Sequence, residues 1–287
     1  MRAAVVVPTR DRPVALARCL DALAAQDLGA VPLVGDLAIL VVDDASADPD
    51  AVRAVAAGRA RVVAGEGRGP AAARNLGARA AGAAGADAVL FTDDDCRPEQ
   101  GWVAAHLARI ERGAAVVAGP TLAGPGAAAP ARAAQVVTNL LVAAPPGAGT
   151  VAFAPTSNLA GRADVFAALP FDERYPSAAG EDRDWCDRYT STGGTIAFEP
   201  TAVVDHHPDL SLRRYWRQQV RYGRGAHRYR AAGDRPRPPI GFYLDLLRAG
   251  FRGGPSVGLL VALAQVATVV GVVAEARAGD GRDRAAR

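Results

Sequence analysis

Three consecutive aspartates, Asp93, Asp94 and Asp95, follow an apolar run over residues 86 to 92. Such a run predicts a buried strand, and three carboxylates crowded at its end repel one another unless a cation or polar ligand lies there. A helix that begins near Pro98 is expected next, and one acid would suffice to cap it. Three acids exceed that need, so the triplet predicts a site for a hard divalent cation such as Mg²⁺ or Mn²⁺.

Two further polar clusters follow apolar runs in the same way. One comes after residues 3 to 7 and the other after residues 37 to 42, and their members are Pro8, Thr9 and Arg10 in the first and Asp43 and Asp44 in the second. Ligands of open parallel sheets bind at the carboxyl ends of strands, so the three clusters predict one shared cleft. Asp43 and Asp44 could also have purely structural roles, one in a turn and the other as a cap of the next helix. For an isolated pair of acids, these structural roles are the more common ones.

The glycine-rich segment 65–69 leads into a predicted helix with Arg74 near its start. Backbone amides at a helix N-terminus, reinforced by an arginine, favour phosphate binding. A glycine-rich stretch is about as often a plain connection between elements. The segment therefore supports a phosphate site only in combination with the strand-end acids.

The elements that must position these residues alternate along the chain. Apolar runs predict strands at 3–7, 37–42, 61–63, 86–92 and 197–204, the last with a break at Pro200, and helical spacing predicts helices at 13–26, 52–57 and 70–84. This alternation predicts an α/β fold in which helices cover both faces of a parallel sheet.

Composition narrows the class of protein. The 287 residues are half apolar, carry a net charge of +3, and contain arginine but no lysine. Three scattered cysteines are too few for a disulfide framework, which favours a reducing compartment, and the N-terminal run is too short for a secretory signal. A cytoplasmic protein with one main core and an appendage is expected.

Four motifs in this order resemble the family 2 glycosyltransferases. They are VVVPTRDRP, VVDDAS, GPAAARNLGARAA and FTDDDC, and the Gly180-Glu181-Asp182 segment resembles the acidic motif that this family has further along the chain. The resemblance spans about residues 3 to 230 and is weakest over 123–150. It implies the GT-A fold, a Rossmann-like, mostly parallel sheet flanked by helices, and inverting transfer of a sugar from a UDP-, GDP- or dTDP-sugar to an acceptor hydroxyl.

The same resemblance implies roles for individual residues. Asp182 is the expected general base, with Glu181 orienting it or the acceptor. Asp95 and Asp93 are expected to hold the metal, with His206 as a third ligand and His207 as second choice; for these histidines a plain surface role is equally compatible. The residues expected to line the donor nucleotide are Pro8, Thr9, Arg10, Asp43, Arg74, Asp93 and Asp94.

The predicted domain organisation has four parts. Residues 1–205 form the catalytic domain, with a nucleotide-binding half at 1–97 and an acceptor half at 98–205; 206–252 is a basic helical extension, 253–276 an apolar helix and 277–287 a disordered tail. The apolar helix is just long enough to span a membrane, and a membrane anchor at the inner face of the cell membrane, a re-entrant helix and a homodimer contact all fit it. The arginine-rich stretch 212–230 fits acidic lipid, the donor diphosphate or plain solvation, and no nucleic-acid module surrounds it, so no nucleic-acid partner is expected.

Two other functions compete with glycosyl transfer. A sugar-1-phosphate nucleotidyltransferase also combines an α/β sheet with metal-binding carboxylates, but its glycine-rich basic signature near the first strand is absent. A catalytically silent nucleotide-sugar-binding or membrane scaffold protein would have no need to keep Asp95 and Asp182. The acceptor, a lipid-linked or cell-envelope glycan or a small metabolite, is not specified by the sequence.

Overall fold

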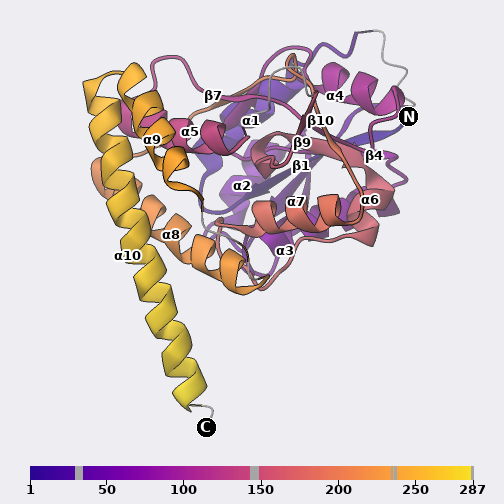
Figure 1. The fold of residues 1–287 in the computed structure, drawn as a ribbon. Helices are drawn as coiled ribbons and strands as arrows, with labels where there is room; N and C mark the ends of the chain where they lie inside the picture. Colours follow the sequence, from indigo (N-terminus) through magenta and orange to yellow (C-terminus); the bar gives the residue numbers. More distant parts are fainter. Residues whose placement is uncertain (30–34, 143–148, 234, 236–237, 286–287) are drawn as a thin grey trace.

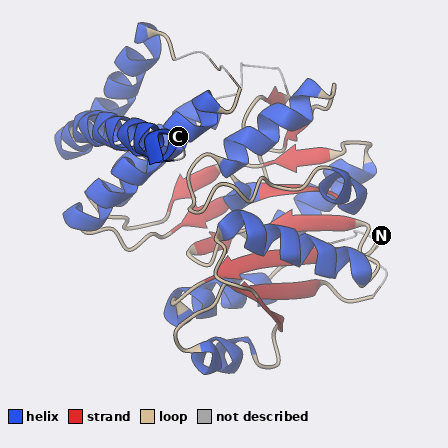
Figure 2. Cartoon of the chain, turned by 90° about the horizontal axis from the view of Figure 1, so that it is seen from below, coloured by secondary structure: helices blue, strands red, loops and turns tan. Residues whose placement is uncertain are grey.

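The structure is a computed structural model that describes the chain except residues 30–34, 143–148, 234, 236–237 and 286–287, and except the side chains of 279–285. An eight-stranded sheet in the order β3-β2-β1-β4-β9-β6-β10-β8 runs through the molecule, and a three-stranded sheet has the order β5-β11-β7. Helices lie on both sides of the large sheet (Figure 2).

The first four strands of the large sheet are parallel, as the alternation of elements predicts. They are β1 (Ala3–Thr9), β2 (Ala38–Asp43), β3 (Arg61–Ala64) and β4 (Ala88–Phe91). Thr9 pairs in register with Asp43, so the ends of β1 and β2 are level. This register brings the polar residues that follow each strand to one edge of the sheet.

The two faces of β1 contribute to two separate cores, because successive strand residues point to opposite faces. Val5 and Val7 pack with the helices α1 (Pro13–Ala24), α2 (Pro49–Ala56) and α4 (Trp102–Glu111). Val6 packs on the other face with α3 (Pro70–Ala83), α6 (Ala163–Ala168) and α7 (Glu181–Ser191). The helices thus cover both faces of the sheet (Figure 1).

The second half of the chain extends the same sheet with mixed pairing. β9 (Leu159–Arg162), which follows the 3₁₀ turn η1 (Thr156–Asn158), runs antiparallel to both β4 and β6 (Val116–Ala118). Beyond β6 lie β10 (Ile196–Phe198) and the short β8 (Thr150–Val151). The two predicted halves of the catalytic domain therefore share one continuous sheet.

Two local predictions are wrong. Residues 96–98 form β5 (Cys96–Pro98), paired with β11 (Val204–His206) beside β7 (Thr121–Ala123), and the helix begins only at Trp102. The predicted strand 197–204 is two strands in different sheets, because the chain turns at Pro200 between β10 and β11. His206 consequently ends β11 rather than following a longer strand.

The C-terminal extension is helical, as predicted. α5 (Ala129–Val142), α8 (Leu212–Ala231), α9 (Ile240–Arg252) and α10 (Pro255–Ala285) share a small core around Tyr215, Leu246 and Val261. α10 projects beyond the body of the molecule to the C-terminus (Figure 1). The expected disordered tail from residue 277 is helical to Ala285, because the apolar helix continues without a break, and its last two residues lie outside the described chain.

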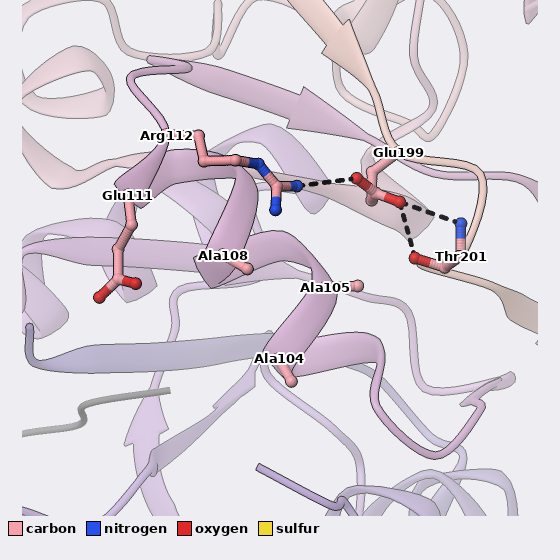
Figure 3. Close-up of a pocket in the computed structure, with 7 residues that line it drawn as sticks. All are labelled: Ala104, Ala105, Ala108, Glu111, Arg112, Glu199 and Thr201. Carbon is pink, nitrogen blue, oxygen red and sulfur yellow. Dashed lines mark hydrogen bonds and ion pairs between the residues drawn. The ribbon is translucent and has the colours of Figure 1, made fainter. Parts of the chain in front are cut away.

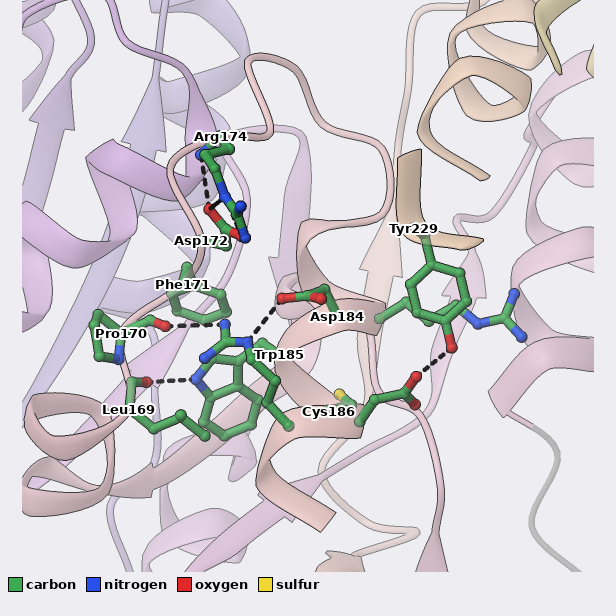
Figure 4. Close-up of polar contacts among 12 residues, drawn as sticks. Leu169, Pro170, Phe171, Asp172, Arg174, Asp184, Trp185, Cys186 and Tyr229 are labelled. Atoms are coloured by element: carbon green, nitrogen blue, oxygen red, sulfur yellow. Dashed lines mark hydrogen bonds and ion pairs between the residues drawn. The ribbon is translucent and has the colours of Figure 1, made fainter. Parts of the chain in front are cut away.

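Three large aromatic residues belong to the core. Trp102 and Trp185 are fully buried and Phe171 is nearly so. The Trp185 indole donates to the Leu169 carbonyl at 2.7 Å, which ties α7 to the end of α6 (Figure 4).

Candidate active site

The loops after β1 and β2 are locked together at the edge of the sheet. The Asp11 amide donates to Ser46 Oγ at 2.9 Å, and the Ala47 amide donates to Asp11 Oδ1 at 2.7 Å. Asp11 and Ala45 have φ values of 56° and 58°, in the left-handed region that non-glycine residues seldom adopt. Backbone held in this way commonly marks a functional site, and here it shapes the rim around the strand ends.

Asp94 is the buried member of the aspartate triplet. Its carboxylate accepts from Thr9 Oγ1 at 2.7 Å and from Arg12 Nη1 at 3.1 Å. Burial and the neighbouring Asp95 charge raise the pKa of Asp94 to about 7, against the opposing effect of Arg12. Asp94 is therefore enclosed by the end of β1 and ties β4 to it, instead of facing an open cleft.

Asp95 lies against the end of β11. Its Oδ1 is 3.4 Å from His206 Nε2, and its Oδ2 accepts from Arg12 Nη1 at 2.9 Å. Burial by itself would raise the pKa of Asp95, but the neighbouring His206 and Arg12 have the larger combined effect and lower this pKa to about 2. Asp95 also raises the pKa of His206 against the opposing effect of burial.

The His206 ring is oriented from α5. His206 Nδ1 lies 3.1 Å from Gln135 Oε1, and the Gln135 amide nitrogen donates to the Thr121 carbonyl at 2.8 Å. With its amide so oriented, Gln135 Oε1 accepts a hydrogen bond from His206 Nδ1–H, which leaves Nε2 as the ring nitrogen that faces Asp95. A hydrogen bond of this kind behind a histidine is typical of metal sites.

The donor atoms of Asp95, Cys96 and His206 all lie within 4.8 Å of one another. Burial raises the pKa of the Cys96 thiol well above its usual value, so the protonated sulfur is a poor ligand. A carboxylate oxygen and an imidazole nitrogen suit Mn²⁺ or Mg²⁺, and Asp95 and His206 fit such an ion. His207 does not join them, because its ring lies against the Gly124 backbone.

Asp93 is held by an arginine that links it to the second acidic motif. The buried Arg74 donates from Nη2 to Asp93 Oδ1 at 2.9 Å and from Nη1 to Glu181 Oε1 at 3.0 Å. Although burial opposes its charge, the two carboxylates raise the pKa of the Arg74 guanidinium. The structure therefore brings residues 74, 93 and 181 together across a long sequence separation, as the site prediction requires.

Asp182 begins the helix α7 beside this cluster. Its Oδ1 accepts from the Arg183 amide at 2.8 Å. Burial and the Glu181 charge raise the pKa of Asp182 to about 7, whereas Arg74 acts in the opposite direction. The side chain is only partly buried, so a carboxylate with a pKa near neutrality is within reach of a ligand.

The remaining predicted donor residues lie on the rim. Asp43 is buried and accepts from the Ser46 amide at 3.0 Å, and the partly buried Pro8 belongs to β1. Arg10 points outward, its side chain 55% exposed beside Asp11. It is Arg12, which the sequence prediction missed, that reaches the aspartate triplet; its position within the same VVVPTRDRP segment is the only sequence signal for it.

A hollow elsewhere in the molecule lies away from the acidic centre. It has a volume of about 530 Å³ and is lined by α4 and the turn at Glu199 and Thr201 (Figure 3). None of the predicted site residues lines it, and Arg112 pairs there with Glu199 at 3.4 Å. The hollow is therefore separate from the acidic centre.

Comparison with known proteins places this geometry in context. The model of the glycosyl transferase family 2 matches residues 4–168, more than half of the chain. The pre-mycofactocin glycosyltransferase of Mycobacterium tuberculosis is 28% identical over 232 residues, which cover 77% of this chain and 46% of the relative. The chain thus spans about half the length of the curated relatives it matches.

Solved structures show the same fold. The mannosyltransferase PcManGT from Pyrobaculum calidifontis, in complex with GDP-Man and Mn²⁺, superposes with a TM-score of 0.61 at 21% identity, covering 100% of this chain and 81% of that one. Residues 1–349 of S. aureus TarS give 0.53 at 15% identity, covering 98% and 92%. The fold is therefore GT-A with a helical C-terminal extension, and the chain belongs to the family 2 glycosyltransferases.

Proposed function

We propose that this glycosyltransferase moves a sugar from a nucleotide-sugar donor to an acceptor hydroxyl by a single displacement with inversion. The observation that carries the proposal is the partly exposed Asp182, whose pKa is raised to about 7, beside the Glu181–Arg74–Asp93 chain. A base with a pKa near the working pH is suited to proton transfer.

In the proposed reaction, the ionised Asp182 accepts the proton of the acceptor hydroxyl as its oxygen attacks the anomeric carbon. The bond from that carbon to the diphosphate breaks on the opposite face, and the proton remains on Asp182. Glu181 accepts from the Ala179 amide at 2.8 Å and from Arg74, so it holds the start of α7 in place. Glu181 is thereby a positioning residue for Asp182.

The donor is proposed to lie over the ends of β1, β2 and β4, along the rim formed by Pro8, Thr9, Arg10 and Asp43, with Arg74 and Asp93 beside the diphosphate and the enclosed Asp94 beneath it. Asp95 and His206, with Asp93, would hold Mg²⁺ or Mn²⁺, and such an ion offsets the negative charge of a departing diphosphate. The GDP-Man and Mn²⁺ in the PcManGT structure make a GDP-sugar with Mn²⁺ the first pair to test, ahead of UDP- and dTDP-sugars.

A membrane location is part of the proposal. Within the stretch Pro255–Ala278, the most apolar 18-residue window has a mean hydropathy of 2.4 and only a third of it is buried, so by length and composition the helix suffices to cross or lie on a membrane. The acceptor hydroxyl would then belong to a molecule at the cytoplasmic face of that membrane.

The test is a panel of UDP-, GDP- and dTDP-sugars with Mn²⁺ or Mg²⁺, scored for binding and for slow donor hydrolysis. One donor is expected to bind tightly in a metal-dependent way, and Asp182→Asn is expected to bind it but not transfer its sugar. The anomeric configuration of the product, read by NMR, tests inversion. The proposal fails if no donor binds, and the assignment of the base fails if Asp182→Asn keeps full transfer activity.

A further inference from the structure

A pocket of about 430 Å³ lies on the arginine-rich helix α8. The proposed function assigns no role to this pocket. Residues of the segment before α7 form one wall and residues of α8 form the other. The lining residues are Pro176, Ser177, Trp216, Arg217, Val220, Arg221, Arg224 and Arg228.

The pocket adjoins the catalytic acids through very close backbone contacts. A Cβ atom on Gly225 of α8 would lie 2.2 Å from the Ala179 carbonyl oxygen, and one on Gly180 would lie 3.1 Å from the Gly225 carbonyl oxygen. α8 therefore rests directly on the residues that precede Glu181 and Asp182. Burial raises the pKa of Tyr222 on α8 to about 12, and the charges of Asp182 and Glu181 add to this.

The donor rim lies on the other side of the same segment. A Cβ atom on Gly69, at the start of α3, would lie 2.8 Å from the Pro176 carbonyl oxygen. The 176–180 segment thus separates the start of α3 from α8. A molecule in the pocket would therefore lie on the α8 side of the segment that leads to Asp182, opposite the start of α3.

The charge of the pocket is largely uncompensated. Arg228 is paired with Glu275 of α10 at 2.8 Å. Arg217, Arg221 and Arg224 are exposed, and within the described residues none of the three has an ion pair with a carboxylate. Their spacing of four and three residues places them on one face of α8, so three guanidinium groups border one hollow.

We propose that this pocket binds a phosphate group of the acceptor and so aligns the acceptor hydroxyl with Asp182. This inference rests on the proposed function, because it needs an acceptor. Arginine forks bind phosphate oxygens in pairs, and a doubly charged phosphate offsets two guanidinium charges where a single carboxylate offsets one.

Two sources of that phosphate fit the surroundings. A Cβ atom on Gly271 of α10 would lie 2.0 Å from the carbonyl oxygen of the pocket residue Val220, so α10 crosses α8 at the pocket. Val266, Val269 and Val273 of α10 are exposed near this crossing and offer an apolar path for a lipid tail. A water-soluble phosphomonoester would use the arginines alone.

The pocket carries its own optical probe. Of the three tryptophans, Trp216 lines the pocket and is partly exposed, whereas Trp102 and Trp185 are fully buried. Titration of the metal-free protein with inorganic phosphate, at constant ionic strength, is expected to change the Trp216 fluorescence saturably. Trp216→Phe is expected to abolish the change.

Arg221→Gln combined with Arg224→Gln tests the pocket. Phosphate binding is expected to weaken about tenfold or more, because two charge-assisted contacts are lost. Arg213→Gln combined with Arg252→Gln removes the same charge from exposed positions outside the pocket and is expected to bind as the wild type does. If both double variants bind phosphate as the wild type does, or if acetate binds as tightly as phosphate, the inference is wrong.

Circular dichroism checks that the variants fold. The single variant Arg217→Gln, at an exposed position, provides a second test if the double variant is unstable, and a several-fold loss of phosphate affinity is expected for it.

The source of the phosphate is then resolved in two arms. In the first arm, the protein is sedimented with phosphatidylcholine vesicles that contain phosphatidic acid. A lipid phosphate is indicated if the protein binds these vesicles and if both the Arg221→Gln, Arg224→Gln double variant and Val269→Asp weaken that binding. Saturable binding of glycerol 3-phosphate without vesicle binding indicates a soluble acceptor. Metal-dependent donor binding by the wild-type protein is measured separately, so its absence would overturn the proposed function while phosphate binding still reports on the pocket.

Discussion

At the scale of single residues, Arg74 organises the acidic centre. It contacts Asp93 after β4 and Glu181 at the start of α7, and it is almost fully buried. A buried cation between two carboxylates fixes their positions, whereas removal of one partner from such a group leaves an uncompensated buried charge. Asp182, next to Glu181, therefore has a fixed location but a raised pKa.

Asp182→Asn is expected to lower kcat by about 10²- to 10⁴-fold, because the asparagine amide cannot accept the acceptor proton. The transfer rate of the wild-type enzyme is expected to rise as the pH passes through about 7, where Asp182 becomes ionised. A pH profile that stays flat between 5.5 and 8.5 with chemistry rate-limiting would contradict this role.

The same substitution is expected to stabilise the folded protein at pH 8. The raised pKa means that the folded state holds the Asp182 proton more tightly than the unfolded state does, so stability from this group falls as the pH rises from about 4 to about 7. An asparagine side chain does not ionise, so Asp182→Asn removes that loss. The free energy of unfolding is expected to rise by on the order of 1 to 3 kcal/mol at pH 8 and to change little at pH 4. Urea unfolding at the two pH values measures it, and an equal effect at both would refute the linkage.

Gln135→Leu is expected to weaken Mn²⁺ binding by about 10- to 100-fold, because His206 loses the acceptor that orients its ring. Titration calorimetry with Mn²⁺ alone measures the affinity. Thr138→Ala, on the same helix, is the matched control, since the Thr138 hydroxyl donates to the Ala134 carbonyl of its own helix and, within the described residues, makes no hydrogen bond to His206. Unchanged affinity in Gln135→Leu would show that Gln135 does not position a metal ligand.

At the scale of elements, α3 lies unusually close to the sheet. A Cβ atom on Gly77 would lie 2.3 Å from Val6 Cγ1, so a side chain there would force α3 away from β1. Because Arg74 stands on the same helix, the short distance between α3 and the sheet also sets how far Arg74 reaches toward Asp93.

Gly77→Ala is expected to lower the free energy of unfolding by about 1 to 3 kcal/mol through overpacking. Gly82→Ala, on the same helix with open space around it, is expected to raise it by about 0.5 to 1 kcal/mol through helix propensity. Denaturant unfolding compares the two. A neutral or stabilising Gly77→Ala would mean that α3 can shift freely on the sheet.

Asn158 performs a related task for the second sheet. Its carbonyl oxygen accepts from Trp102 Nε1 at 2.8 Å and lies 2.9 Å from His106 Nε2, and its amide nitrogen donates to the Ala202 carbonyl at 2.8 Å. Burial lowers the pKa of His106 to about 4, so the histidine is neutral at physiological pH. The network anchors the chain that enters β11 and thereby the position of His206.

At the scale of the whole molecule, α10 has two different faces. Val257, Val261 and Ala264 are fully buried against α5, α8 and α9, whereas Leu259, Val266 and Val269 are between 57% and 65% exposed. An apolar surface of this kind on one helix marks an interaction site, here proposed to be the membrane.

Val261→Asp is expected to destabilise the extension by about 3 kcal/mol or more, because a charge would be buried without a partner. Val269→Asp makes the same change on the exposed face and is expected to alter the free energy of unfolding by no more than about 0.5 kcal/mol. Thermal unfolding of detergent-free protein compares the two. Equal destabilisation would mean that a second copy of the chain covers Val269.

Local sequence is enough to predict the parallel strands β1 to β4 and the clusters at their ends, because apolar periodicity and strand-end polarity are local properties. The prediction that the acids at 93–95 and at 181–182 belong to one site comes from the family resemblance and not from a local pattern. Three contacts emerge only from the folded chain: Arg74 joins those acids, Arg12 rather than Arg10 reaches the triplet, and Gln135 holds His206. These contacts join residues of different elements, and packing rather than local sequence sets their distances.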